Sequence, residues 1–159
     1  MQPRIQPRIQ PLAPAARHAL APLLAAYAVE MRGVLEGAEV PPPEAQAALL
    51  ARHPAAEVLV AGDTQAPVGF AVLFDLPEVV FARRCGQLDD LFVLPHHRGR
   101  GLARALVSAA VEMGRERGWS HLRWMVPEAD AAAIALYERI AERASWRSYV
   151  IRLTPGASL

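Results

Sequence analysis

The sequence of 159 residues contains no lysine and a single cysteine, and these shortages exclude several kinds of protein. Without lysine the chain cannot form a P-loop, whose pattern requires Gly-Lys followed by Ser or Thr. A lone cysteine, Cys85, excludes an internal disulfide and indicates a reducing compartment, so we expect a cytoplasmic protein. Cys85 falls in a predicted loop, and nothing in the sequence places a catalytic base beside it.

The sequence also lacks a strong net charge and any long hydrophobic run. A formal net charge of +1 gives no overall field for nucleic acid or a membrane surface, so neither is an expected partner. The apolar stretches are too short to span a bilayer, and the N-terminus, rich in proline and arginine, does not resemble a secretory leader. The length predicts one domain over residues 1–159, with residues 1–7 as a disordered tail.

Charge is concentrated locally instead. Residues 30–44 contain four glutamates and one arginine, whereas residues 95–110 contain three arginines and no acidic residue. This contrast suits an anionic cofactor on one face and a cationic substrate on another. His96 and His97 are adjacent and have no third ligand at a workable spacing, so we expect no metal site.

Hydrophobic periodicity and helix breakers predict alternating strands and helices. We expect strands at residues 9–12, 57–61, 68–75, 87–93, 122–126 and 148–153, and helices at residues 14–31, 43–52, 101–117 and 130–143. Residues 62–65 are a predicted hairpin turn, and residues 76–86 a predicted irregular arm. The middle strands indicate an antiparallel meander and the later ones parallel crossings, so the predicted fold class is α/β (α+β-like) with a mixed sheet.

The most informative segment is residues 91–104, where an apolar strand leads through a glycine- and arginine-rich turn into an amphipathic helix. The first turn of a helix has unpaired N–H groups at the positive end of the helix dipole. Gly99 and Gly101 let the backbone bend tightly and approach a ligand. The segment therefore predicts a phosphate or pyrophosphate site. The dinucleotide pattern G-x-G-x-x-G is excluded, because Arg104 occupies the place of its third glycine.

The pattern Arg98-x-x-Gly101-x-Ala103 resembles the coenzyme-A-binding motif of the GNAT superfamily of N-acetyltransferases, Q/R-x-x-G-x-G/A. The resemblance runs from about Val68 to Leu153. It implies the GNAT fold, with a mixed sheet of six to seven strands and about four helices. It also implies acetyl-CoA as cosubstrate, with its pyrophosphate on the loop amides. The residues expected to contact acetyl-CoA are Leu91, Phe92, Val93, Arg98, Gly99, Arg100, Gly101, Leu102, Ala103 and Arg104.

Residues 133–139, Ala-Ile-Ala-Leu-Tyr-Glu-Arg, are similar to a second motif of the family, N-x-x-A-x-x-L-Y-E on its last helix. In the family this tyrosine is the usual general acid toward the sulfur of the departing coenzyme A, so the resemblance assigns that role to Tyr137. On a helix, Tyr137 lies about 100° around the axis from Leu136, at the edge of the apolar face. A surface tyrosine with its hydroxyl in water is the structural alternative.

Asp89 and Asp90 come just before the cofactor motif, and in a regular strand they point to opposite faces. Leu88, Asp90 and Phe92 are then expected on one side of the strand. The stretch 88–93 resembles the I-E-D-F-F-V strand of the diamine and polyamine acetyltransferase branch. Carried over by position, Asp89 is the expected base and Asp90 the expected amine-binding group. Which of the two accepts the proton stays open.

We therefore expect an N-acetyltransferase that acetylates the primary amine of a small cationic molecule by direct attack in a ternary complex. The branch that the chain resembles forms dimers, which leaves a homodimer open, with Trp146 as a contact. The chain departs from this branch at Ala129-Asp130, in place of Trp-Asn, and at Ala141-Glu142, in place of Gly-Phe or Gly-Ala. A peptide or protein N-acetyltransferase and a catalytically silent acyl-CoA-binding module are the alternatives.

Overall fold

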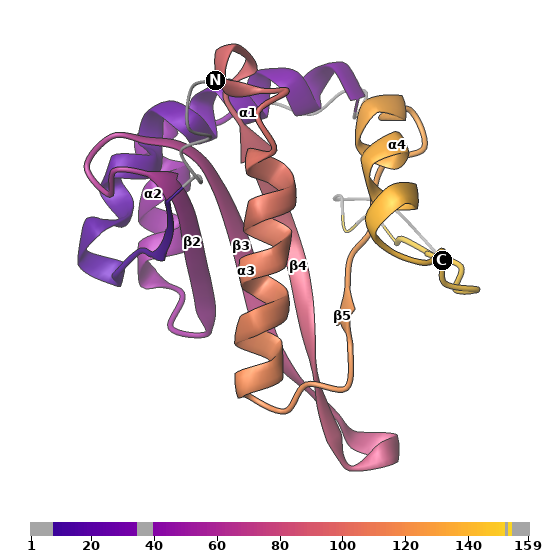
Figure 1. Ribbon diagram of the computed structural model, residues 1–159. Coiled ribbons are helices and arrows are strands. Elements are labelled where there is room, and N and C mark those ends of the chain that lie inside the picture. Colours follow the sequence, from indigo (N-terminus) through magenta and orange to yellow (C-terminus); the bar gives the residue numbers. More distant parts are fainter. Residues whose placement is uncertain (1–7, 35–39, 152, 154–159) are drawn as a thin grey trace, which may run out of the picture.

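The computed structural model describes residues 8–34, 40–151 and 153 (Figure 1). The predicted tail and part of the acidic segment 30–44 lie outside these residues. The elements follow in the order β1 (Ile9–Pro11), a 3-10 segment (Pro14–Leu20), α1 (Ala21–Val34), α2 (Pro43–Arg52), β2 (Ala56–Gly62), β3 (Pro67–Glu78), β4 (Arg83–Val93), α3 (Leu102–Glu116), β5 (Leu122–Arg123) and α4 (Ala131–Ile140).

The strands form one mixed sheet in the order β1-β2-β3-β4-β5. The pairs from β1 to β4 are antiparallel, and β5 pairs parallel to β4 after the crossover through α3. This is the meander and parallel crossing expected from the sequence, and the four α-helices were also predicted. The predicted helix over residues 14–31 is divided, because its first part is the 3-10 segment and Pro22 lies in the first turn of α1.

The sheet has five strands in the described residues, so the expected number of six to seven strands is wrong. The missing strand is the one predicted at residues 148–153, because residues 148–151 and 153 have no regular structure. The aromatic and branched residues there do favour a strand. However, β5 is only two residues long, shorter than the predicted 122–126, and offers little edge to pair with. Trp146 and Tyr149 are consequently 87% and 85% exposed.

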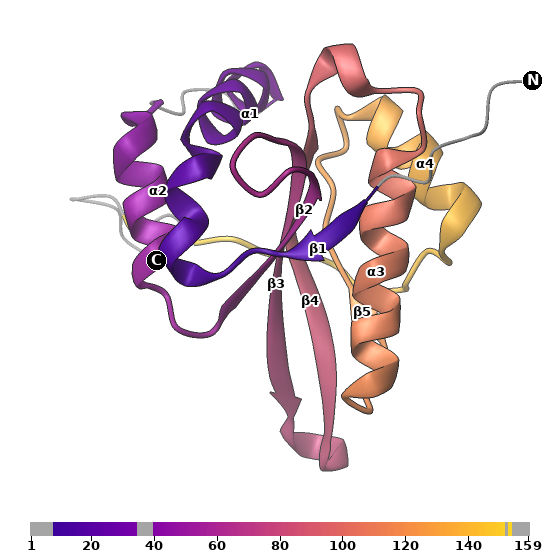
Figure 2. The same ribbon diagram turned by 60° about the vertical axis from the view of Figure 1, so that its left-hand side comes forward.

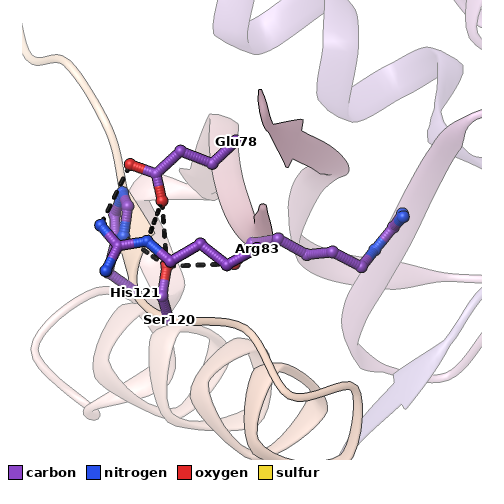
Figure 3. Close-up of polar contacts among 5 residues, drawn as sticks. Glu78, Arg83, Ser120 and His121 are labelled. Carbon is purple, nitrogen blue, oxygen red and sulfur yellow. Dashed lines mark hydrogen bonds and ion pairs between the residues drawn. The ribbon is translucent and has the colours of Figure 1, made fainter. Parts of the chain in front are cut away.

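The arm predicted to be irregular at residues 76–86 is instead a long hairpin of β3 and β4, which projects from the rest of the molecule (Figure 2). Ion pairs of Arg83 with Glu78 and of Arg84 with Asp75 join the two strands near the tip. Figure 3 shows the Glu78 carboxylate between the guanidinium of Arg83 and the hydroxyl of Ser120. Cys85 is therefore a buried strand residue and not a loop residue.

Helices cover both faces of the sheet: α1 and α2 lie on one side and α3 on the other (Figure 2). The α1 face packs a buried cluster of Leu12, Leu20, Leu23, Ala56, Val58, Val60, Phe70, Val72 and Phe92. The α3 face packs Leu59, Ala61, Ala71, Leu73, Leu88, Val93, Leu106, Val107 and Ala110. Because β3 and β4 contribute to both clusters, these central strands are packed on both faces.

Arg17 is the one charged residue buried among the described residues, at 3% exposure. Its guanidinium donates hydrogen bonds to the carbonyl oxygens of Leu50, His53 and Ala56, at the end of α2 and the start of β2. The last carbonyl groups of a helix have no partner within the helix. Arg17 therefore closes the end of α2 from the neighbouring 3-10 segment.

Trp119 is wedged between two glycines of different elements. A Cβ atom at Gly86 of β4 would lie 2.3 Å from Cζ3 of the indole, and one at Gly114 of α3 would lie 2.7 Å from Cε3. Both glycines therefore allow a close approach that no other residue permits. Gly118, with a φ of 68°, ends α3 where the sequence predicted.

Candidate active site

A bulge in β4 decides how the two aspartates lie. Asp90 and Leu88 are opposite consecutive residues of β3, so Asp89 between them is the extra residue. Leu88 consequently packs in the cluster under α3, whereas Phe92 packs in the cluster under α1. The prediction that Leu88, Asp90 and Phe92 share one side is therefore wrong. Asp90 shares the α1 side with Phe92, and Asp89 is exposed at the bulge.

Tyr27 of α1 packs over this part of β4. The centroid of its ring lies 5.3 Å from that of Phe92 and 5.9 Å from that of Phe70. Burial raises the pKa of Tyr27 well above its usual value, and the nearby carboxylate of Asp90 raises it further. The hydroxyl therefore stays protonated in the neutral range.

Asp90 is half-buried, and its carboxylate is subject to opposing influences. Burial raises the pKa of Asp90, the charge of Asp89 raises it further, and the nearby Tyr27 hydroxyl lowers it. No ion pair engages Asp90 within the residues that the structure covers. A partly desolvated carboxylate without a cation is an arrangement typical of functional sites.

Tyr137 lies on α4, which follows β5 in the chain. Asp130 caps α4 as predicted, its carboxylate accepting a hydrogen bond of 3.0 Å from the N–H of Ala133. The Tyr137 ring is half-buried and meets Trp124 edge-on at 5.2 Å between centroids. Burial, followed by the charge of Asp130, raises the pKa of Tyr137.

The ionisable side chains described above come from three elements: Tyr27 from α1, Asp89 and Asp90 from β4, and Tyr137 from α4. The sequence predicted the last three. It missed Tyr27, because Tyr27 falls in the apolar stripe of a predicted helix, a position typical of a core residue. The one sign that could have identified it is that a buried tyrosine needs a hydrogen-bond partner for its hydroxyl.

Strands β4 and β5 run apart toward α4 (Figure 1). Their pairing is confined to Gly86 and Gln87 opposite Leu122 and Arg123. Along residues 88–93, β4 consequently has a strand partner on one side alone within the described part of the chain. Main-chain groups on the other side are left for a ligand that carries amide or carbonyl groups.

The predicted phosphate loop joins β4 to α3. Gly99 and Gly101 have φ angles of 73° and 79°. Gly101 is the N-cap residue of α3, directly before its first residue. A Cβ atom at either glycine would meet nothing within 4 Å, so the backbone conformation, and not crowding, requires glycine here. The first turn of α3 contains no acidic residue, which leaves its N–H groups available to an anion.

The three arginines of the loop differ in their surroundings. The Nε group of Arg98 donates to the carbonyl of Val93 at 2.8 Å, and its guanidinium binds Glu30 of α1 at 2.6 Å. Arg98 thus ties the loop to α1. Arg100 and Arg104 are exposed and form no ion pair with any described residue.

A groove of about 330 Å³ runs from Arg104 between α3 and α4. Arg115 and Arg139 line it together with a single acid, Glu112, so its lining carries a net positive charge. The groove extends the positive surface of the phosphate loop along the outside of α3.

Replacing Gly101 by alanine is expected to weaken acetyl-CoA binding about tenfold and to destabilise the fold by about 1–2 kcal/mol. Gly101 has a left-handed backbone conformation, which costs a residue with a Cβ atom about 1–2 kcal/mol of stability. If the backbone relaxes away from this conformation, the N–H groups of α3 move with it. Calorimetry and denaturant unfolding measure the two effects. Gly33 in α1 is the control: Gly33→Ala also meets open space but has no positive φ, and should leave binding unchanged. Unchanged acetyl-CoA affinity in Gly101→Ala would argue against the loop as the binding site.

Two kinds of feature have no candidate among the described residues. No helix among them is both long and apolar enough to cross a membrane. Nor do any three histidine, cysteine, aspartate or glutamate side chains among them gather where they could hold a metal ion.

The chain is similar to curated acetyltransferases over limited regions. It is 42% identical to streptothricin acetyltransferase of Streptomyces lavendulae over 53 residues, which are 33% of this chain and 28% of that protein. It is 38% identical to thialysine N-epsilon-acetyltransferase of Caenorhabditis elegans, also over 53 residues and 33% of each chain. The chain thus matches about a third of the length of these two relatives.

Similarity to a solved structure covers nearly the whole chain. The ribosomal-protein-alanine N-acetyltransferase from Brucella melitensis biovar Abortus 2308 is 38% identical, with a TM-score of 0.79, over 94% of this chain and 100% of that chain. A sequence model of the acetyltransferase (GNAT) family matches residues 21–141, which is more than half of the chain and includes the phosphate loop and α4. The chain therefore belongs to the acetyltransferase (GNAT) family.

Proposed function

We propose that the protein is an N-acetyltransferase that moves the acetyl group of acetyl-CoA to a primary amine by direct attack in a ternary complex. Acetyltransferases of the family use acetyl-CoA as their cosubstrate. The observation that carries the proposal is the glycine loop at the start of α3, where Gly99 and Gly101 have positive φ angles and the first helical turn has no acidic residue, next to the edge of β4 that β5 leaves open. In the proposal this anion site holds the cosubstrate, Asp90 binds the amine and Tyr137 donates the proton.

The cosubstrate is held at its two ends by different groups. The N–H groups that follow Gly99 and Gly101 bind the pyrophosphate, and Arg100 and Arg104 add charge at the same place. The main chain of residues 91–93 pairs with the pantetheine arm and polarises the thioester carbonyl. Donors aimed at that oxygen stabilise the negative charge that develops there in the transition state.

The acceptor amine must lose a proton before it attacks. A primary amine has a pKa of about 10.4, so at neutral pH it arrives as an ammonium ion, and deprotonation costs roughly 4–5 kcal/mol. Asp90 binds this ion, and the exposed Asp89 passes the proton to water. The amine nitrogen then bonds to the carbonyl carbon, the carbon–sulfur bond breaks, and Tyr137 protonates the thiolate. The nitrogen, which is cationic after it bonds, releases its second proton, and this proton restores the Tyr137 hydroxyl through water. The products are an amide and free coenzyme A.

The acceptor is a small cationic amine in this proposal, because Asp90 offers a carboxylate with no cation of its own. The amino terminus of a protein is the second candidate. The similarity over almost the full chain to a ribosomal-protein-alanine N-acetyltransferase favours it.

The test is release of free thiol from acetyl-CoA in the presence of small amines and of alanine- or serine-initiated peptides. Release with small amines supports the first acceptor class, and release with peptides alone supports the second. Acetyl-CoA binding without release for any amine would identify a silent acyl-CoA-binding protein and contradict the proposal.

Replacing Asp90 by asparagine is expected to lower kcat/KM for the amine about 10–100-fold, mainly through KM. A hydrogen bond to a charged group contributes about 1.5–3 kcal/mol, and the substitution removes the charge without changing the shape. Asp89→Asn should have a smaller effect on KM, because Asp89 is exposed at the bulge. Glu116→Gln, an exposed neutralisation on α3, is the matched control. Equal KM values for the amine in wild type and Asp90→Asn would show that a group other than Asp90 binds the amine.

A further inference from the structure

We propose that Glu30 of α1 is a positioning residue for acetyl-CoA. Glu30 holds the side chain of Arg98, and through Arg98 it holds the phosphate loop in the conformation that binds the pyrophosphate. The two residues are 68 positions apart in the chain, and no sequence motif marks Glu30. The inference rests on the proposed function, because it takes the phosphate loop as the site of the pyrophosphate.

The guanidinium of Arg98 makes three contacts, and none of them is with the phosphate loop itself. Its Nε group donates to the carbonyl oxygen of Val93 at 2.8 Å, and Nη2 donates to Oε2 of Glu30 at 2.6 Å. Its central carbon lies 5.5 Å from the centroid of the Phe92 ring. The end of β4 and the carboxylate on α1 thus hold the planar group in one orientation.

Arg98 is the last residue before the main chain enters the anion site. Its own N–H donates at 3.2 Å to Pro95, the first residue of the 3-10 turn before it. From Gly99 to Arg104, the N–H groups have no main-chain acceptor within the described part of the chain. Two of these residues are glycines, which have many backbone conformations of similar energy. Fixing Arg98 at the start of this run therefore restricts where the unpaired N–H groups point.

The helix that carries Glu30 is itself anchored beside Arg98. Tyr27 lies three residues earlier on α1, and such residues are neighbours on a helix surface. The Tyr27 ring packs against Phe92 at 5.3 Å and against Phe70 at 5.9 Å between centroids. Tyr27 of α1 and Arg98 of the loop thus contact the same ring, that of Phe92. The Glu30 carboxylate is therefore presented to the loop from a packed helix.

The ion pair has little to do with the stability of the fold. The side chains of Arg98 and Glu30 are 44% and 40% exposed, and pairs of such exposure contribute little to stability. What the pair does is direct a side chain whose main chain begins the anion site. A loop that is ordered before binding does not lose that conformational freedom when acetyl-CoA binds, which favours affinity.

Direct binding of the pyrophosphate by Arg98 is the alternative, and it predicts an effect of opposite sign. Glu30 would then compete with the anion for the guanidinium, so Glu30→Gln would bind acetyl-CoA more tightly. Positioning predicts weaker binding in Glu30→Gln, because Arg98 is released and the loop must be ordered on binding.

The experiment measures the dissociation constant for acetyl-CoA by calorimetry in wild type, Glu30→Gln, Arg98→Met and the double variant. A salt concentration of about 0.15 M screens the direct repulsion between Glu30 and the anion beyond about 8 Å. Each single variant is expected to raise the dissociation constant about 3–10-fold. The double variant should bind no more weakly than Arg98→Met, because the two residues act through one contact.

Further measurements separate positioning from a merely structural role. The melting temperature of Glu30→Gln without ligand should lie within about 2 °C of wild type. Its KM for acetyl-CoA should rise while kcat at saturating acetyl-CoA stays near that of wild type. Arg100→Met removes a charge from the loop itself, so its effect should add to that of Glu30→Gln. Glu116→Gln, an exposed neutralisation on α3, should leave the dissociation constant unchanged.

The outcomes distinguish the inference from the function on which it rests. Unchanged or tighter binding in Glu30→Gln overturns the role of Glu30, and so do additive effects of Glu30→Gln and Arg98→Met. A lower melting temperature with an unchanged dissociation constant overturns it as well, since the pair would then be structural. In each of these cases wild type still binds acetyl-CoA and transfers acetyl groups. If wild type itself does not bind acetyl-CoA, the proposed function fails.

Discussion

Replacing Tyr137 by phenylalanine is expected to lower kcat by about 10²–10⁴-fold, the range for loss of one general acid. The substitution keeps the ring and its edge-on contact with Trp124, so it removes a hydroxyl and little packing. Burial raises the pKa of Tyr137, which keeps the proton on the hydroxyl throughout the neutral range. The proton is therefore present when the thiolate departs.

The raised pKa of Tyr137 also limits how far kcat is expected to fall in Tyr137→Phe. A tyrosine of ordinary pKa, about 10, is a weaker acid than a simple thiol of about 8.5, so proton transfer to the thiolate is uphill by roughly 2 kcal/mol. Burial of Tyr137 adds to this difference. We therefore expect the loss to lie in the lower part of the range.

The measurement is kcat with both substrates saturating, together with the dissociation constant for coenzyme A. Tyr149→Phe serves as the control, since it makes the same chemical change on a ring that is 85% exposed. An unchanged dissociation constant with a reduced kcat is the expected pattern for Tyr137→Phe. A kcat equal to that of wild type in Tyr137→Phe would show that Tyr137 is not the general acid.

Replacing Arg17 by methionine is expected to lower the free energy of unfolding by about 3–4 kcal/mol. Hydrogen bonds from a charged donor contribute about 1.5–3 kcal/mol each, and Arg17 makes them to Leu50, His53 and Ala56. Methionine fills part of the volume but leaves those carbonyl groups without their donor. The cost falls below the sum of three bonds because the variant no longer buries a charge. Native domains have about 5–15 kcal/mol in total, so the effect is large.

Denaturant unfolding measures this loss, with Arg32→Met as the control. Arg32 is an exposed arginine of α1, and its replacement should change stability by less than about 0.5 kcal/mol. A loss below about 1 kcal/mol in Arg17→Met would show that water can take the place of the guanidinium at the end of α2.

The features that the sequence predicted correctly have local causes. The glycine turn before α3 follows from the conformations that Gly99 and Gly101 allow, and the periodicity of residues 102–116 identifies the helix itself. Asp130 identifies the start of α4, because a capping aspartate acts on the next few residues alone. Such signals need no knowledge of the rest of the chain.

The features that it missed depend on distant contacts. The bulge at Asp89 is a relation between β4 and β3, and strand periodicity in one segment cannot reveal an extra residue against another. The packing of Tyr27 against Phe92 joins α1 to β4, which only the folded chain brings together. The strand predicted at residues 148–153 failed for a related reason, since strand propensity needs an edge long enough to pair with, and β5 pairs through two residues.

The indole of Trp119 has a consequence for redesign of this protein. Because it occupies the space of a Cβ atom at both Gly86 and Gly114, these three positions form a unit that joins β4 to α3. Free-energy changes at such contacting positions do not add. A library that varies one of them alone would yield mostly clashes or voids, whereas a smaller residue at 119 combined with alanine at 86 and 114 could restore the volume.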